Sequence, residues 1–488
     1  MTPDLAAPLR EALLTADFTY DAVSGLLGEV AHAALLRNET TPAVRRAAGP
    51  DPLATLVRLF LLQRPVPAEA AERALPGLVD RMTTAGLLTR SVGEVAARLD
   101  CRPYATDDGV DLWVVSDLTP GLDGGPQRVG AEHVLGISAA STSLAQLTLR
   151  HEVRTSLDLG TGCGVQALHL AEHSDRVVAT DVNPRALEIA RFNAALNGVA
   201  DRVDVRAGSF FEPVAGERFD LVSTNPPFVI SPATGERLVY RDSGLPGDRV
   251  VEHIVRTAPD HLADGGWCQV LANWVISADQ PWDERLAGWL PEGCDAFVVQ
   301  REVLDPAAYV ELWLKDSGHH GAPDYHQRYD TWLSWMEDQG VGGVGFGWIN
   351  LRRTGAADAA RELLEWPYDV EQPIAPAVAA WSEAVHTGVD AASRLIVRED
   401  VRQETVGAAG AADPATIVLR QQRGLRRARQ VDTVAAAVVG ACDGELTVGQ
   451  ILAAVADLLG LDPAATTAER LTEVAELVHE GFLVAAAG

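Results

Sequence analysis

Residues 219–230, FDLVSTNPPFVI, place an amide, two prolines and an aromatic ring directly after a buried strand. A planar NH2 group is a poor nucleophile, because its lone pair is delocalised and must lose that conjugation before it can attack a methyl group. The Asn225 oxygen and the Pro226 carbonyl can accept both of its N–H bonds and stabilise the developing cation. Pro226 and Pro227 fix φ and remove competing donors, and Phe228 can stack on a flat acceptor. The alternative is a plain turn, since Asn-Pro often opens one.

A glycine-rich turn, DLGTGCGVQALHLAEH, begins at Asp158. Gly160, Gly162 and Gly164 have no Cβ atoms, so a ligand can approach the backbone where the next helix starts. The dinucleotide fingerprint begins in the same way, but Gly164 follows Gly162 after two positions where that motif has three. A nicotinamide-dependent oxidoreductase is therefore an alternative. Asp158 would lie beneath the turn, where it can accept amide hydrogen bonds or face a cationic ligand.

A second strand ends in VVATDVNPRALEIARFNAALNG, which places Asp181 21 residues after Gly160. A carboxylate at the end of this strand can accept hydrogen bonds from both ribose hydroxyls. The alternative role is an N-cap for the helix that begins near Pro184. With the glycine turn at the expected distance, the pattern predicts a crevice for a nucleoside cofactor.

The elements that must position these residues are seven β-branched runs, most of them separated by segments of helical period. Alternating strands and helices predict a doubly wound, mostly parallel, seven-stranded α/β sheet. Because the ligand of such a sheet lies outside the carboxyl ends of its strands, we expect Asp158, Gly160, Asp181 and Asn225 to converge. An insertion that includes a helix over 323–339 precedes the last strand. The predicted strands are 155–160, 176–181, 202–208, 219–224, 266–275, 294–303 and 343–353.

The regions on either side of the sheet are Ala/Leu-rich with helical periodicity. A winged-helix shape is one interpretation of both terminal domains. Docking or packing is favoured over DNA binding, because neither has a basic recognition helix. The predicted domains are a helical domain at 1–100, a linker strand and cofactor-covering segment at 101–150, the main catalytic domain at 151–390, and three helices closing on a short strand at 412–488.

The segments DLGTGCG, TDVNP and STNPPF resemble class I S-adenosylmethionine-dependent methyltransferases with an N-P-P-[FY] motif. These include HemK-type protein glutamine methyltransferases, small-domain rRNA guanine methyltransferases and N6-adenine methyltransferases. The resemblance covers residues 150–355 and implies a Rossmann-like fold and methyl transfer to a planar nitrogen. It also implies that Gly160, Thr161, Gly162, Cys163 and Gly164 hold the methionine part of the cofactor, that Asp181 with Val182 binds the ribose, and that Asn225, Pro226, Pro227 and Phe228 hold the target amino group.

Two stretches depart from the pattern of these families. After the third strand, where they often have an acidic or amide residue for the adenine amine, this chain has Ser209, Phe210 and Phe211. A serine can bond the adenine edge and a phenylalanine can stack on it. Residues 240–248, YRDSGLPGD, replace the Gly-Gly-x-Asp-Gly stretch of HemK-like chains, which weakens the transfer of their release-factor substrate. Residues 134–147 lie where these enzymes place a segment that covers the cofactor.

The net charge of -28 bears on the partner. Such a surface repels a polyanion on average, so a protein or peptide acceptor, or a small molecule, is favoured and an rRNA or DNA base is the alternative. A cofactor-binding regulator without turnover is a further alternative. Five arginines near the C-terminus are interpreted as a solvated face that balances an acidic chain, and nucleic-acid contact there is the alternative. They are Arg420, Arg423, Arg426, Arg427 and Arg429.

Cysteine and histidine usage predicts no metal site. The five cysteines are scattered without a C-x-x-C pair, which fits a reducing compartment. His319, His320 and His326 with Asp324 match no closed site and are predicted to lie in a solvated loop. There is no uncharged apolar run of about 18 residues, and charges interrupt the N-terminal segment where a signal peptide needs an apolar core. We therefore expect a cytoplasmic protein without a membrane span.

Overall fold

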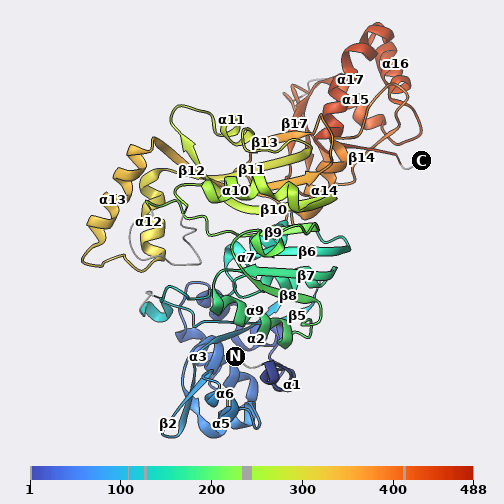
Figure 1. Ribbon diagram of the computed structural model, residues 1–488. Coiled ribbons are helices and arrows are strands. Elements are labelled where there is room, and N and C mark those ends of the chain that lie inside the picture. Colours follow the sequence, from blue (N-terminus) through green and yellow to red (C-terminus); the bar gives the residue numbers. More distant parts are fainter. Residues whose placement is uncertain (1–2, 108, 126–128, 233–244, 410–413, 487–488) are drawn as a thin grey trace. The chain divides into compact units, whose positions relative to one another are not determined.

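The computed structural model describes residues 3–107, 109–125, 129–232, 245–409 and 414–486 (Figure 1). The chain divides into two compact units, Met1–Trp366 and Pro367–Gly488. The first contains the predicted sheet and the second contains the C-terminal helices. Of the stretch 240–248, residues 240–244 lie outside the described residues.

The first unit is built around an eight-stranded sheet in the order β13-β11-β12-β10-β9-β6-β7-β8. All seven predicted strands are present, and β13 adds an eighth beside β11. Neighbouring strands are parallel except at β12, which is antiparallel to both β10 and β11. The doubly wound, mostly parallel α/β prediction is confirmed. The strands are β6 (Val153–Leu159), β7 (Ser174–Asp181), β8 (Val203–Ala207), β9 (Phe219–Thr224), β10 (Leu262–Ser277), β11 (Cys294–Leu304), β12 (Val341–Arg353) and β13 (Arg361–Glu365).

The helices between these strands bury apolar faces of helical period. In α10 (Arg249–Thr257), the residues Val250, Val251, Ile254 and Val255 pack against the apolar core of the sheet. Burying each such side chain contributes roughly 1.5 to 3 kcal/mol before entropy is counted. The other helices of the sheet region are α8 (Val165–Ala171), α9 (Pro184–Leu196) and α11 (Trp282–Ala287). Among the described residues, no helix has the length and apolar character needed to cross a bilayer.

The N-terminal region is helical, but it also holds a small sheet in the order β1-β3-β2. Its core, which includes Phe18 and Phe60, continues into Phe192 and Leu196 on α9, so this region packs against a helix of the sheet region. The winged-helix interpretation stays a prediction. The elements are α1 (Ala6–Thr15), α2 (Tyr20–Leu35), α3 (Thr41–Arg46), α4 (Pro52–Leu56), a π-helical turn (Val57–Leu61), β1 (Val66–Pro67), α5 (Ala68–Ala74), α6 (Val79–Thr84), β2 (Leu88–Ser91) and β3 (Glu94–Ala97).

A hairpin of β4 (Asp100–Ala105) and β5 (Asp111–Ser116) connects this region to the sheet. Asn193 of α9 and Asn197, the C-cap residue of this helix, hydrogen-bond the backbone at the free edge of β5. Asn193 exchanges hydrogen bonds of 2.9 and 2.8 Å with the backbone of Val115, and Asn197 does the same with Trp113 at 2.9 and 2.8 Å. Side-chain amides thus take the place of a neighbouring strand. The helix α7 (Ala139–Leu147) follows and lies in the predicted covering segment.

An insertion between β11 and β12 forms α12 (Pro306–Asp316) and α13 (Tyr325–Asp338), which lie beside each other in Figure 1. The second is the helix predicted over 323–339. Trp332 and Trp335 pack against a cluster that includes Tyr309 and Met336, which confirms the prediction that they are packing residues. In the part of the chain that the structure describes, no group of three or more His, Cys, Asp or Glu residues could hold a metal ion.

The second unit begins at Pro367, so the predicted boundary at 390 falls inside it. Residues before 390 are bound to this unit, as Glu371 illustrates. Its N–H donates to the Gly424 carbonyl at 2.8 Å, and its carboxylate accepts from the Gly424 N–H at 3.0 Å. The elements are α14 (Ala375–Ala384), β14 (Leu395–Val397), β15 (Val401–Val406), β16 (Thr416–Gln421), β17 (Ala428–Val431), α15 (Thr433–Ala441), α16 (Val448–Leu459), α17 (Pro463–His479) and β18 (Leu483–Ala485).

The arginine segment of the second unit lies on β16, β17 and their turn. Arg420 pairs with Glu404 at 2.8 Å. Arg429 pairs with Glu476 at 2.5 Å and with Glu480 at 2.9 Å. These two guanidinium groups are therefore already matched by carboxylates of the same unit.

Candidate active site

The carboxyl ends of β6, β7 and β9 open onto one cavity of about 390 Å³. These strands are neighbours in the sheet, so the ends of all three meet at one edge. Most of the predicted site residues line this cavity. They are Asp158, Gly160, Thr161, Gly162, Cys163, Asp181, Val182, Ser209, Phe210, Asn225, Pro226 and Pro227. Gly164 and Phe228 do not line it.

The glycine turn uses its three glycines in two ways. All have positive φ, +79° at Gly160, +56° at Gly162 and +87° at Gly164, which other residues adopt at a cost. A Cβ at Gly160 or Gly162 would meet nothing within 4 Å, whereas one at Gly164 would lie 3.1 Å from the Ala190 Cα on α9. The first two glycines therefore leave open space where the turn borders the cavity. Gly164 permits close packing of α8 on α9.

Asp181 holds the glycine turn from the end of β7. Its carboxylate accepts the Gly162 N–H at 2.9 Å and the Asn183 N–H at 2.8 Å. Burial raises the pKa of this carboxyl above its usual range, against the lowering effect of those amide hydrogen bonds. Each carboxylate oxygen has a second lone pair, so the group can accept further donors from a ligand in the cavity.

Asp158 lies beneath the turn, as predicted, and is almost fully buried. One oxygen accepts the Thr161 hydroxyl at 2.6 Å and the Ala167 N–H at 3.0 Å. Burial raises the pKa of Asp158 to about 7, because a low-dielectric site disfavours the charged form. A positive charge in the cavity would favour ionisation. Burial also raises the pKa of the Cys163 thiol to about 11, so this thiol is not a nucleophile at neutral pH.

Asn225 follows the last residue of β9, whose hydroxyl fixes the strand end. The Thr224 hydroxyl donates to the Leu159 carbonyl of β6 at 2.7 Å. The Oδ1 atom of Asn225 is buried and has no hydrogen-bond partner among the described residues. An unpaired buried acceptor costs about 1 to 3 kcal/mol. Buried polar groups are nearly always hydrogen-bonded, so this oxygen is available to accept a donor from a ligand or a water molecule.

Phe228 departs from the arrangement we expected for a stacking ring. It is partly buried against the apolar core of the sheet, together with Ile276 and Trp282. Two residues later, Ile230 is fully buried. The stacking role of Phe228 therefore stays a prediction, and no contact with the cavity supports it.

The rim after β8 carries Ser209 and Phe210. Phe210 has a φ of +46°, and its ring meets His253 edge-on at 4.9 Å between centroids. The Gly208 N–H donates to the Asp181 carbonyl at 3.1 Å, which ties this rim to the end of β7. Both residues border the cavity, as the adenine-binding prediction requires.

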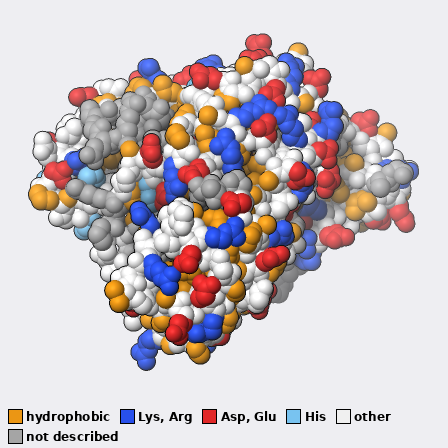
Figure 2. Space-filling view, turned by 60° about the horizontal axis from the view of Figure 1, so that its bottom comes forward, with side chains coloured by type: hydrophobic (Ala, Val, Ile, Leu, Met, Phe, Trp, Pro, Cys, Tyr) orange, Lys and Arg blue, Asp and Glu red, His pale blue; other side chains and the backbone are white. Residues whose placement is uncertain are grey.

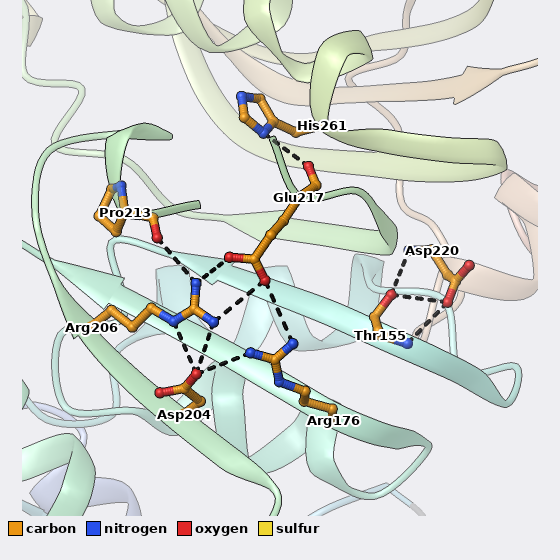
Figure 3. A network of polar contacts seen from close by, with 8 residues as sticks. All are labelled: Thr155, Arg176, Asp204, Arg206, Pro213, Glu217, Asp220 and His261. Carbon is orange, nitrogen blue, oxygen red and sulfur yellow. Dashed lines mark hydrogen bonds and ion pairs between the residues drawn. The ribbon is translucent and has the colours of Figure 1, made fainter. Parts of the chain in front are cut away.

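A network of ion pairs anchors the segment behind this rim (Figure 3). Arg206 on β8 pairs with Asp204 at 2.9 Å and with Glu217, and Arg176 on β7 reaches the same carboxylates at 3.1 and 3.5 Å. Arg206 also donates to the Pro213 carbonyl at 3.1 Å. The hydrogen bond from Arg206 lowers the pKa of Glu217. Because Ser209 and Phe210 lie between β8 and Pro213, the network restricts where the rim can lie.

Three residues that were not predicted as site residues, Gln166, Ser138 and Ser141, also line the cavity. Ser138 caps α7 through a reciprocal pair with Ser141. The Gln166 amide donates to the Ser141 carbonyl at 2.6 Å, so the predicted covering segment is joined to the first turn of α8. No local signal marked Gln166, because His169 is a second polar residue in the same short helix. Asn193 was also missed, and its amide donates to the Cys163 carbonyl at 2.7 Å.

Three family models match parts of the chain. Residues 136–287 match the methyltransferase small domain. Residues 15–98 and residues 377–485 match two different domains of unknown function. The matched central region contains the glycine turn, Asp181 and the Asn-Pro-Pro-Phe segment.

Curated relatives match part of the chain. It is 34% identical over 149 residues to the ribosomal protein uL3 glutamine methyltransferase of Bradyrhizobium diazoefficiens, which covers 28% of this chain and 47% of that protein. It is 36% identical over 133 residues to the release factor glutamine methyltransferase of Xylella fastidiosa, a match that covers 25% of this chain and 47% of that protein. It is 34% identical over 151 residues to ribosomal RNA small subunit methyltransferase C of Klebsiella pneumoniae, a match that covers 30% of this chain and 40% of that protein. The chain spans about half the length of these relatives or less.

Among solved structures, the methyltransferase from Pyrococcus furiosus is 17% identical to this chain. The match covers 45% of this chain and 84% of that protein and has a TM-score of 0.26. A score of that size carries no argument about function. Most residues that line the cavity at the ends of β6, β7 and β9 lie within the family match. Residues 136–287 therefore carry the sequence pattern of the methyltransferase small domain, on the strands whose carboxyl ends form the cavity.

Proposed function

We propose that this protein is an S-adenosylmethionine-dependent N-methyltransferase that modifies a planar amide or aromatic amino nitrogen. The observation that carries the proposal is the unpartnered, buried Oδ1 of Asn225, which lies beside a cavity bordered by the glycine turn and Asp181. An acceptor NH2 group would supply the missing donor. A simple turn after β9 would leave that oxygen exposed to water or bonded to the chain.

The residues around the cavity fit the cofactor. The open space above Gly160 and Gly162 accommodates the methionine part, and Asp181 has free lone pairs for ribose hydroxyls. Ser209 and Phe210 border the cavity where an adenine would be held. When bound, S-adenosylmethionine supplies an electrophilic methyl group on a sulfonium leaving group, so no strong base is needed once the nitrogen is aligned.

The chain contributes alignment and hydrogen bonding to the acceptor. The Asn225 oxygen and the Pro226 carbonyl each accept one N–H bond, and these bonds strengthen as the nitrogen becomes positively charged. Pro226 and Pro227 have no N–H of their own that would occupy these acceptors. Solvent takes the proton that the nitrogen then loses.

A protein or peptide acceptor is favoured. Two relatives are named as glutamine methyltransferases of a ribosomal protein and a release factor. The net charge of -28 opposes a polyanion, and on the face in Figure 2 basic side chains lie among acidic ones. The second candidate is a base amino group of RNA or DNA, which the similarity to ribosomal RNA small subunit methyltransferase C supports. We also propose a cytoplasmic location, since the five cysteines are buried free thiols.

The test is radiolabelled methyl transfer from S-adenosylmethionine into a cell extract, with Asn225→Ala beside the wild type and cofactor binding measured by calorimetry for both. We expect label in a protease-sensitive fraction, lost in the variant, with cofactor affinity nearly unchanged. Label removed by nuclease would instead establish the nucleic-acid acceptor, and label that survives both treatments would identify a small molecule. Cofactor binding without any transfer would favour a regulator.

A further inference from the structure

The loop that carries Asn225 is held at its far end by the insertion between β11 and β12. Ile230, five residues after Asn225, is fully buried. Its N–H donates to the Tyr309 hydroxyl at 2.9 Å, and its carbonyl accepts the Trp332 indole N–H at 3.0 Å. Both backbone groups of one loop residue are thus bound by side chains from α12 and α13, far away in the sequence.

Tyr309 also connects this contact to the sheet. Its hydroxyl oxygen accepts a second hydrogen bond, from the Asn273 amide of β10, at 3.1 Å. Burial raises the pKa of Tyr309, so the phenol stays neutral in the physiological range. The ring lies 5.9 Å from Phe346 and 6.4 Å from Trp332 between centroids. The hydroxyl is therefore fixed by its ring packing as well as by its two donors.

These contacts leave the loop few ways to move. At its start, the Thr224 hydroxyl is bonded to the Leu159 carbonyl of β6. At its end, both the N–H and the carbonyl of Ile230 are hydrogen-bonded. Between them, Pro226 and Pro227 have fixed φ angles. A short segment restrained at both ends with two locked dihedrals is preorganised, and a displacement of about 1 Å in such a segment can cost about 100-fold in rate.

We propose that the α12–α13 insertion positions the acceptor-binding loop, and that Tyr309 is its principal positioning residue. This inference rests on the proposed function, because the loop is the one that would hold the planar NH2 group. Tyr309 touches neither the cavity nor the reacting atoms. It acts through Ile230, and it should therefore affect the methyl-transfer rate and leave cofactor binding unchanged.

The first experiment needs no acceptor. Hydrogen exchange is measured on the full chain for the peptide spanning 225–232 in the wild type, Tyr309→Phe and Tyr329→Phe. The control, Tyr329, belongs to the same aromatic cluster, but its hydroxyl donates to Glu311 at 3.1 Å. We expect exchange in this peptide to rise about tenfold or more in Tyr309→Phe and to stay at the wild-type level in the control. Equal exchange in all three proteins would overturn the inference.

The second experiment measures methyl transfer at saturating S-adenosylmethionine into the extract fraction that the wild type labels. We expect the maximal rate to fall about tenfold in Tyr309→Phe, a barrier increase of about 1.4 kcal/mol, with the KM for S-adenosylmethionine within about twofold of the wild type. A parallel loss of cofactor binding, or an unchanged rate, would contradict a positioning role. Trp332→Phe replaces Tyr309→Phe if the latter does not fold. If the wild type labels nothing, the proposed function fails, and the exchange result still decides whether Tyr309 holds the loop.

Discussion

The side chain of Gln166 joins the first turn of α8 to the Ser141 carbonyl of α7 at 2.6 Å. Gln166 is 5% exposed, and its Oε1 has no hydrogen-bond partner within the described residues. The Nε2 atom already donates to α7, so the Oε1 atom can accept a hydrogen bond from another donor. The residue thus closes the covering segment against the glycine turn and keeps one acceptor beside the cavity.

Replacing Gln166 by Ala should weaken cofactor binding without unfolding the protein. The substitution removes one hydrogen bond of α7, worth about 0.5 to 1.5 kcal/mol net, so we expect roughly a threefold to tenfold loss of affinity for S-adenosylmethionine. Isothermal titration calorimetry measures it. The exposed Gln327 on α13 provides the matched control, Gln327→Ala. Equal affinities in both variants would show that α7 is held by other contacts.

The ionisation of Asp158 predicts a pH dependence of cofactor binding. Its pKa of about 7 in the free protein means that the carboxyl is largely protonated below pH 7. The sulfonium and ammonium charges of S-adenosylmethionine favour the carboxylate, so binding should lower this pKa and release a proton. Affinity should therefore rise as the pH increases from about 5.5 to 7.5.

Calorimetry in two buffers of different ionisation enthalpy counts that proton. Asp158→Asn provides the comparison, because it preserves the shape of the side chain and has no proton to release. We expect a flat affinity profile for the variant over the same range. A profile of the wild type that is equally flat would mean that Asp158 is ionised already or does not face the positive charges.

The ion-pair network behind the rim predicts how stability depends on pH. The hydrogen bond from Arg206 lowers the pKa of Glu217 in the folded protein. Glu217 therefore contributes to the free energy of unfolding above its unfolded-state pKa of about 4.3, and this contribution is lost as the pH falls through the folded-state pKa. The group is partly exposed, and we expect no more than about 1 kcal/mol. Urea denaturation of Glu217→Gln should show this loss at pH 7 and no difference from the wild type at low pH. The exposed Glu29→Gln should match the wild type at both.

Local patterns predict the sheet well and the contacts of the site less well. Buried parallel strands are continuous apolar runs, so all seven were recognisable. The eighth, β13, has the sequence RELLE at a sheet edge and lacks that signal. Asp158, Asp181 and Asn225 follow strands, and strand topology alone brings them together.

The residues that were missed depend on distant partners. Tyr309 bonds a backbone group 79 residues away, and Gln166 bonds one 25 residues away. Neither belongs to a local motif, so only the folded chain reveals these pairs. The stacking role of Phe228 stays a prediction for a related reason, since the core of the sheet competes with the cavity for an aromatic ring, and no residue next to Phe228 indicates which environment it occupies.

The different surroundings of Gly162 and Gly164 predict that the two alanine variants fail in different ways. Both positions have positive φ, which costs an alanine about 1 to 2 kcal/mol. At Gly164 the new methyl group would also lie 3.1 Å from the Ala190 Cα and 3.2 Å from its Cβ, and overpacking adds about 1 to 3 kcal/mol. At Gly162 the methyl group would enter open space beside the cavity.

Gly164→Ala should therefore lower the melting temperature more than Gly162→Ala does, because only the first variant forces α8 away from α9. Gly162→Ala should lower the affinity for S-adenosylmethionine more, by about tenfold or greater, because its methyl group occupies space that the cofactor needs. Thermal denaturation and calorimetry on the same two proteins measure both effects. Variants that lose stability and affinity in equal proportion would show that the turn acts as one unit. The reverse order would place the cofactor against Gly164 and contradict the proposed site.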